Sequence, residues 1–209
     1  MKKITYILSM ALMLSSAFFQ VACDGLLHDD EDSTTVDPNG GGEVVYDGAV
    51  QSFSVQLSYN SDKLSNPASL NANTLTAVAL NNSSEADLTL VRQSTLGYVI
   101  ASPNAPYVKV LLRYNRSSFN NSGYRTTKVM KLNGDVSNYS DVSSLKNLTV
   151  SSGSIENVPG KNQVVVNSGD VIAFETQSGV KGVAKVSGLS KITGKVTLTG
   201  YVYYASSAK

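Results

Sequence analysis

The side chains that most often bind metals or carry out catalysis are scarce in this sequence. It contains one Cys, Cys23, one His, His28, and no Trp. Residues 44–209 therefore offer Met130 as their one soft ligand, and a metal or haem site needs several converging donors. His28 lies in an acidic, polar stretch, where a solvated role is the simpler explanation. We predict no metal site and no cofactor.

Enzymatic activity would have to use other groups. With no His in residues 44–209, a Ser nucleophile would depend on Lys as its base, and no Gly-x-Ser-x-Gly turn is present. A pair of carboxyls could hydrolyse glycosides. The acids available for such a pair are Glu85, Asp87, Glu156, Asp170 and Glu175. Each is explained more simply as a turn or strand-face residue, so we predict no catalytic residue and keep a hydrolase as a third alternative.

The start of the chain gives the lone Cys a different use. Two lysines precede the uncharged apolar run Ile4–Phe19, and small residues lead to Cys23. This order is typical of a secretory signal peptide, which we assign to residues 1–22. We predict that Cys23 is the lipidated first residue of a bacterial lipoprotein, anchored to a membrane by its acyl chains. Gln20 departs from the aliphatic residue preferred in such cleavage motifs, which leaves an incidental Cys beside an ordinary cleavage site as the alternative.

Residues 23–43 are expected to form a flexible tether. They are rich in acids and end in a Gly-rich run, and neither like charge nor glycine favours a fixed conformation. Four consecutive acids resemble the acidic surface-export signal of Bacteroidetes lipoproteins: Asp29, Asp30, Glu31 and Asp32. Asp32-Ser33-Thr34 resembles the short O-glycosylation motif of the same phylum, which implies glycosylation at Ser33. The resemblance implies a cell-surface location on the outer membrane; a periplasm-facing lipoprotein with a solvated linker is the alternative.

Charge argues against a nucleic-acid partner. The whole chain has 17 Lys and Arg against 16 Asp and Glu. Without the two lysines of the signal peptide and the six acids before Pro38, residues 38–209 retain 15 basic and 10 acidic residues. This excess is mild and spread along the chain, and no basic cluster approaches a nucleic-acid footprint.

The elements that must position any site are predominantly strands. Apolar residues alternate with polar ones from Phe53 to Tyr59, the period-2 pattern of a strand with one buried face. Further strands are predicted at 75–80, 86–92, 98–101, 108–114, 126–132, 163–166, 170–176, 180–186 and 195–204. One short helix is predicted in Ser140–Val150, capped by Ser140 or Asp141.

Strands this numerous, separated by turns about every ten residues, indicate a sandwich or barrel. We therefore predict a single all-β domain over residues 44–209, antiparallel and sandwich-like, with at most one short helix.

The C-terminal third carries a family resemblance. Gly169–Thr176, the Gly179 turn, Gly182–Val186 and Gly194–Leu198 are similar to the closing strands of small Bacteroidetes surface lipoproteins. Residues 86–90 with Ser102-Pro103-Asn104 resemble the middle hairpin of the same group. The resemblance implies an extracytoplasmic β-sandwich-like module that is not an enzyme.

Binding functions remain open on the sequence. Three tyrosines near the C-terminus, Tyr201, Tyr203 and Tyr204, could form an exposed aromatic face for a glycan. Half-burial in strands is the simpler interpretation of these residues. The leading hypothesis is a non-enzymatic surface module for adhesion or assembly with a protein partner, and the alternative is a lipoprotein that binds a glycan or another small molecule. A cleft lined by exposed tyrosines would favour ligand binding, whereas a long exposed strand edge would favour assembly by strand addition.

Overall fold

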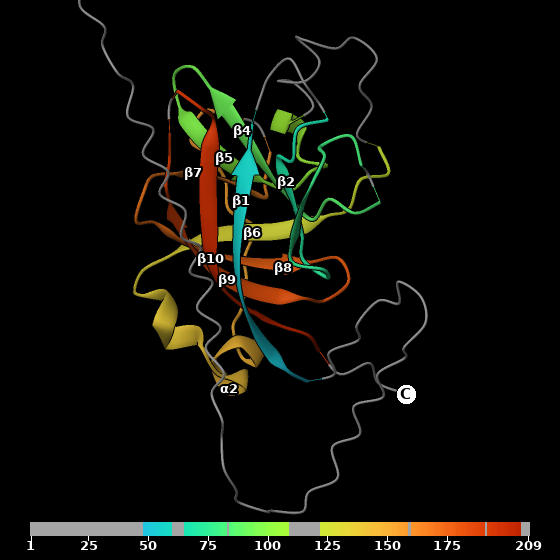
Figure 1. The fold of residues 1–209 in the computed structure, drawn as a ribbon, viewed down its shortest axis with the longest axis vertical. Coiled ribbons are helices and arrows are strands. Elements are labelled where there is room, and N and C mark those ends of the chain that lie inside the picture. The colour runs from blue at the N-terminus through green and yellow to red at the C-terminus, as the bar shows by residue number, and fades with distance from the viewer. Residues whose placement is uncertain are drawn as a thin grey trace, which may run out of the picture. The chain divides into compact units, whose positions relative to one another are not determined.

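The computed structural model describes residues 48–59, 65–82, 84–108, 122–158, 160–190 and 192–205. The chain divides into two units, Met1–Gly40 and Gly41–Lys209, and every described residue belongs to the second. The described part is built mainly of antiparallel strands joined by turns and short helical segments (Figure 1). This confirms the prediction of an all-β, sandwich-like domain.

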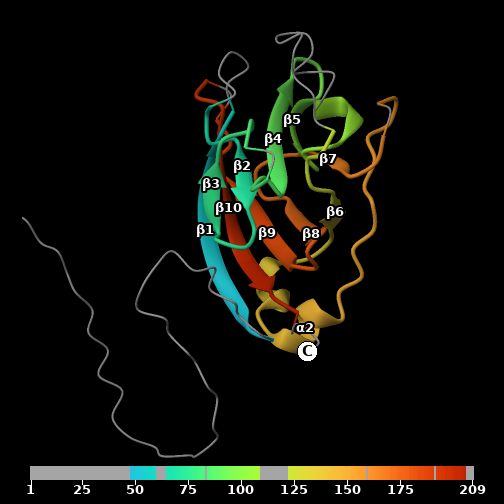
Figure 2. The ribbon, with the colours of Figure 1, turned by 90° about the vertical axis from the view of Figure 1, so that its right-hand side faces the viewer.

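Within the described residues, the strands form two five-stranded antiparallel sheets. The first sheet runs in the order β1 (Val50–Ser58), β10 (Lys195–Tyr203), β9 (Lys181–Ser187), β8 (Val171–Thr176) and β6 (Thr127–Leu132). The second runs in the order β3 (Thr76–Val78), β2 (Ser69–Asn71), β4 (Leu88–Gln93), β5 (Gly97–Ala101) and β7 (Gln163–Val166). The first and last of the described strands are thus neighbours, and β1 and β6 lie at opposite margins of the first sheet (Figure 2).

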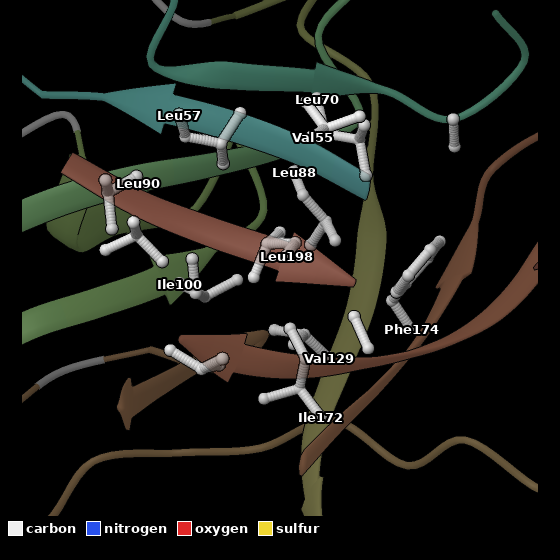
Figure 3. Close-up of a cluster of buried hydrophobic side chains, with 14 of the residues drawn as sticks. Val55, Leu57, Leu70, Leu88, Leu90, Ile100, Val129, Ile172, Phe174 and Leu198 are labelled. Carbon is white, nitrogen blue, oxygen red and sulfur yellow. The ribbon is translucent and has the colours of Figure 1, made fainter. Parts of the chain in front are cut away.

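The main core lies between the two sheets. Phe53, Val55 and Leu57 project from β1 into it, as the alternation in this stretch predicts. Figure 3 shows Val55 and Leu57 among buried aliphatic and aromatic side chains from both sheets, including Leu90 and Phe174. Burying each such side chain contributes about 1.5–3 kcal/mol, so this cluster supplies much of the stability of the fold.

Both sheets are also covered in part on their outer faces. On the first sheet, α2 (Val142–Lys146) and η1 (Val136–Tyr139) pack over a smaller apolar cluster that includes Leu145 and Val183. On the second sheet, Tyr107 and Val108 lie in another apolar cluster with Val91, Val99 and Ala101. A sheet buried on both faces needs apolar residues on both. This explains why β8 reads as a nearly continuous apolar run.

The predicted short helix is confirmed as α2, with Asp141 as its N-cap. The Asp141 carboxylate accepts a hydrogen bond from Ser144 N at 2.9 Å, and this bond lowers the pKa of Asp141. At the other end, Lys181 Nζ donates to Lys146 O at 2.8 Å, so a cation meets the carbonyls of the last turn. Val142 is 41% exposed, because a helix of one turn can bury little more than Leu145.

Three local features differ from the sequence-based expectations. Residues 106–108 are helical, so Val108 is not part of the strand predicted over 108–114, and residues 109–114 lie outside the described part. β2 was not predicted, because a three-residue strand ending in Asn71 has too little apolar pattern to stand out from a loop. The additional turn η1 is capped by Asp135, whose side chain accepts a hydrogen bond from Ser137 N. The alternation of apolar residues does not reveal this local bond.

Candidate functional site

The outer edge of β1 is the longest strand margin in the described part of the chain. At the two ends of the strand, Tyr59 N donates to Gly194 O at 2.9 Å and Tyr204 N donates to Ala49 O at 3.3 Å. Both pairs continue the β1–β10 register, so the odd-numbered residues of β1 exchange hydrogen bonds with β10. The N–H and C=O groups that point away from the sheet are those of Val50, Ser52, Ser54 and Gln56.

These outward backbone groups have no hydrogen-bond partner among the described residues. The next outward N–H, that of Ser58, is already used, since it donates to Pro67 O at 2.9 Å. Among the described residues, the stretch from Val50 to Gln56 is therefore an unpaired backbone edge about 20 Å long, the length of an extended segment of seven residues. The strands β2 and β3 of the second sheet also lie near β1 without pairing with it.

The side chains of this open edge are small and uncharged. Ser52, Ser54 and Gln56 are exposed on the outer face, where Ser54 Oγ lies 3.1 Å from Thr199 Oγ1. The whole strand, VQSFSVQLS, contains no Lys, no Pro and no acid. Lysines, prolines, bulges and covering segments are the devices by which natural sheets prevent unwanted pairing at an edge. Of these protective features, β1 lacks both of those that depend on residue type, lysine and proline.

The opposite edge of the same sheet, on β6, is closed by other segments. Its outward Thr127 N donates to Ser102 Oγ at 2.9 Å, and its outward Val129 O accepts from Gly153 N at 2.7 Å. Gly153 O in turn accepts from Gln163 N of β7 at 3.2 Å, so one residue bridges the two sheets. A Cβ on Gly153 would lie 2.6 Å from Val129 O, which explains why a glycine occupies this position.

The margins of the second sheet offer less room. β3 is three residues long and β7 four, and the first outward N–H of β7 is taken by Gly153. Beyond this bridge lies an open hollow of about 400 Å³, lined by residues that include Lys131, Ile155 and Val165. No tyrosine is among the described residues that line this hollow.

The strongest electrostatic feature is the ion pair between the buried Asp87 and the partly exposed Arg125. Asp87 Oδ1 lies 3.2 Å from Arg125 Nη1, and Ala72 N donates to Asp87 Oδ2 at 2.8 Å. The Asp87 side chain is 1% exposed, and burial raises its pKa even though the Ala72 N–H and the Arg125 charge both act to lower it. A carboxyl so enclosed cannot meet a substrate. Its role is to tie the start of β4 to the segment that leads into β6.

The other carboxyls considered for catalysis are held in ion pairs or stand at the surface. Asp170 lies 2.6 Å from Lys131 Nζ, and Glu175 lies 3.3 Å from Lys128 Nζ. Glu85 and Glu156 are exposed. The structure therefore brings Asp87, Asp170 and Glu175 to basic partners, which is the arrangement of structural ion pairs.

The three C-terminal tyrosines do not form a shared exposed surface. Tyr203 and Tyr204 are 6% and 8% exposed, and Tyr201 is half-buried beside the cluster under α2. Tyr204 Oη donates to Ala72 O at 3.0 Å inside the sandwich. The structure thus agrees with burial in strands, the simpler interpretation of these tyrosines, and not with the alternative of an exposed aromatic face, because β10 is covered on both sides at its C-terminal end.

The targeting and modification sites predicted in the N-terminal part lie outside the described residues. These are the signal peptide, the lipidation site Cys23, the acids Asp29, Asp30, Glu31 and Asp32, and Ser33. In the part that the structure describes, no helix is long and apolar enough to cross a membrane. Nor do three His, Cys, Asp or Glu residues of that part gather closely enough to hold a metal ion.

Ser52, Ser54 and Gln56 are not among the candidate site residues predicted from the sequence. Their exposure follows from the alternation along β1, which the sequence does reveal. That β1 would be an edge strand depends on the order of strands in the sheet, which the sequence does not encode locally. Comparison with models of known protein families, with curated proteins and with solved structures gave no match.

Proposed function

We propose that this protein is a lipid-anchored module of the outer membrane, facing the cell surface, that acts without catalysis by accepting a partner strand at the edge of β1. The observation that carries the proposal is the stretch from Val50 to Gln56, whose outward backbone groups have no partner in the described part of the chain and whose side chains are uncharged. An extended segment added there would satisfy those groups by the same geometry that joins β1 to β10.

The anchor rests on the sequence. Cys23 follows a signal-peptide pattern, and the acids at 29–32 resemble a surface-export signal. The chain with Cys23→Ala should be released from membranes into soluble fractions, while the unaltered protein should be cleaved by protease added to intact cells. Retention of the Cys23→Ala chain in membranes would overturn the anchor, and protection from protease until the outer membrane is lysed would overturn the surface location.

Other activities receive less support from the described residues. The glycan alternative depended on an aromatic surface that Tyr203 and Tyr204 do not provide. A hydrolase would need two carboxyls facing one another, whereas Asp87, Asp170 and Glu175 face basic side chains.

The strand-accepting role can be tested by giving β1 the protection that natural edges carry. In Ser52→Lys/Ser54→Lys, two lysines stand at the edge on exposed positions, so the domain should stay folded and lose its partner. The matched control is Asn138→Lys/Ser168→Lys, which adds the same charge at exposed positions elsewhere. Native electrophoresis of complexes from mildly solubilised membranes should show loss of the larger species in the first variant alone. Equal complexes in both variants would contradict the proposal.

A further inference from the structure

The open edge also indicates which strand it accepts. Resting on the proposed function above, we propose that the partner is β1 of a second copy of this chain, added antiparallel in a register centred on Phe53. The two five-stranded first sheets would then join into one continuous sheet across a twofold axis.

The position of the open stretch selects this register. The outward groups run from Val50 to Gln56, and Phe53 is the midpoint of that stretch. A twofold axis at Phe53 places Val50 opposite Gln56 of the second copy and Ser52 opposite its Ser54, and the reverse. These four residue pairs exchange about eight hydrogen bonds, two for each pair. The pairing uses all the outward groups of the stretch and leaves the Ser58 N–H with Pro67.

The side chains of β1 tolerate their own copies across the axis. A twofold interface is self-complementary, so each residue must be compatible with its symmetry mate. On the exposed face Ser52 would meet Ser54, and on the core face Phe53 would meet Phe53, an aromatic pair across a non-hydrogen-bonded position. Like charges directly opposite one another destabilise a strand pair, and Val50–Ser58 contains no charge.

Charge also distinguishes a second copy from a foreign strand. An edge that recruits a charged partner carries complementary charge. β1 offers no such guide. Its specificity has to come from shape and from backbone bonds, which an identical uncharged strand matches.

The proposed anchor is compatible with the pairing. The two β1 strands run in opposite directions, so their tethers leave the joined sheet at different points. About 27 residues separate Cys23 from Val50, and an extended chain of that length reaches about 90 Å. Both tethers can therefore reach one membrane, where confinement raises the effective concentration of a pairing that is weak in dilute solution.

Photo-cross-linking in cells identifies the partner directly. A photoreactive phenylalanine analogue replaces Ser54 in the full-length chain, and the same analogue at Ser168 is the control, on an exposed turn distant in sequence from β1. We expect a product of twice the chain mass that contains only this protein, formed from position 54 and not from 168. A product containing a different protein would overturn self-pairing while leaving the strand-accepting function intact. No product from position 54 would overturn both.

Cysteine pairs test the register. Residues directly opposite in a hydrogen-bonded pair have Cα atoms about 5.5 Å apart, within disulfide reach, whereas diagonal neighbours are about 7–8 Å apart. Cells should carry one tagged copy with Ser52→Cys and another with Ser54→Cys, and be oxidised mildly with copper phenanthroline. The mixed disulfide should form at least tenfold faster than either variant links to itself. Equal linking in all combinations, or fastest linking of Ser54→Cys to itself, would overturn the register centred on Phe53.

Discussion

The two margins of the first sheet satisfy their backbone groups in different ways. At β6, the outward Thr127 N–H and Val129 C=O bond to Ser102 and Gly153. At β1, the equivalent groups from Val50 to Gln56 have no partner in the described part of the chain. The same sheet is thus closed at one side by its own chain and left open at the other.

The closed side is also protected by charge. Lys128 and Lys131 stand on β6, and the Asp87–Arg125 ion pair anchors the segment just before it. The β1 side depends on the burial of Phe53, Val55 and Leu57 and presents only serine and glutamine outward. Internal closure therefore stabilises the fold at β6, whereas the open edge at β1 is available for a partner. Substitutions on the β6 side should change stability, and those on the β1 side should change association.

The largest loss of stability is expected from Arg125→Met. It leaves the Asp87 carboxylate buried without its counter-charge. Breaking a fully buried pair costs about 3–5 kcal/mol, and the loss here should lie toward the lower end because the Arg125 side chain is 33% exposed and its charge is partly screened by water. Urea denaturation should show this loss, while Arg92→Met, which removes an exposed Arg near the Tyr98 ring, should cost about 1 kcal/mol or less. Equal losses for the two variants would show that the ion pair does not hold the closed side.

A smaller loss is expected from Gly153→Ala. The new Cβ would lie 2.6 Å from both Val129 O and Val164 Cγ1, so the bridge between β6 and β7 must shift, at about 1–3 kcal/mol. Ser154→Ala, at the exposed neighbouring position, is the control and should change the unfolding free energy by less than about 0.5 kcal/mol. If Gly153→Ala were equally mild, the bridge would not be the feature that closes this edge.

Two carboxyls on the closed side should respond to pH in opposite directions. The pKa of Asp87 is raised in the folded state. Its contribution to the free energy of unfolding is therefore fully present below the unfolded-state pKa, near 3.8, and is lost as pH rises through the folded-state pKa. For Asp170, partial burial is outweighed by the Lys131 and Asn167 hydrogen bonds and the Lys131 charge, so its pKa is lowered. The contribution of Asp170 to the free energy of unfolding is present above the unfolded-state pKa of 3.8 and is lost as pH falls through the folded-state pKa.

Unfolding free energies measured across the acidic range should therefore separate two variants. As pH rises, the stability difference between the unaltered protein and Asp87→Asn should shrink, and the difference from Asp170→Asn should grow. Parallel pH profiles for the two variants would contradict the assigned environments.

The smallest effect is expected from Lys128→Ser. Its ion pair with Glu175 is formed by a side chain that is 49% exposed, and pairs of this kind contribute about 0–1 kcal/mol. The protein should also remain unchanged in sedimentation velocity, because Ser102 and Gly153 still cover β6. New self-association of this variant would mean that the lysine, and not the covering segments, protects that edge.

The sequence predicted those elements of the fold in which the pattern of apolar and polar side chains reflects which residues are buried. Alternation placed the strand at Phe53 correctly, and Asp141 correctly marked the start of α2. Val108 was misplaced because an apolar run on the outer face of a covered sheet resembles a central strand. Gly182 shows another limit: its missing Cβ makes room for the Phe174 ring on the neighbouring strand, and such contacts depend on tertiary register.

The candidate site was less predictable than the fold. The exposed serines of β1 are visible in the alternation, yet their meaning depends on β1 pairing with β10 on one side alone. That pairing joins residues about 150 positions apart, at Ser52 and Tyr201. Tyr203 and Tyr204 left two interpretations open on the sequence, an exposed aromatic face or burial in strands, and the elements from elsewhere in the chain that bury them decide for the second.

Amide hydrogen exchange along β1, resolved residue by residue in the Cys23→Ala chain, tests the open edge most directly. In dilute solution the amides of Ser52, Ser54 and Gln56 should exchange fast, while those of Phe53, Val55 and Leu57, bonded to β10, should be protected. On concentration, the first set should become protected as a second strand is added. Equal protection of both sets in dilute solution, or no gain for the first set on concentration, would contradict the account.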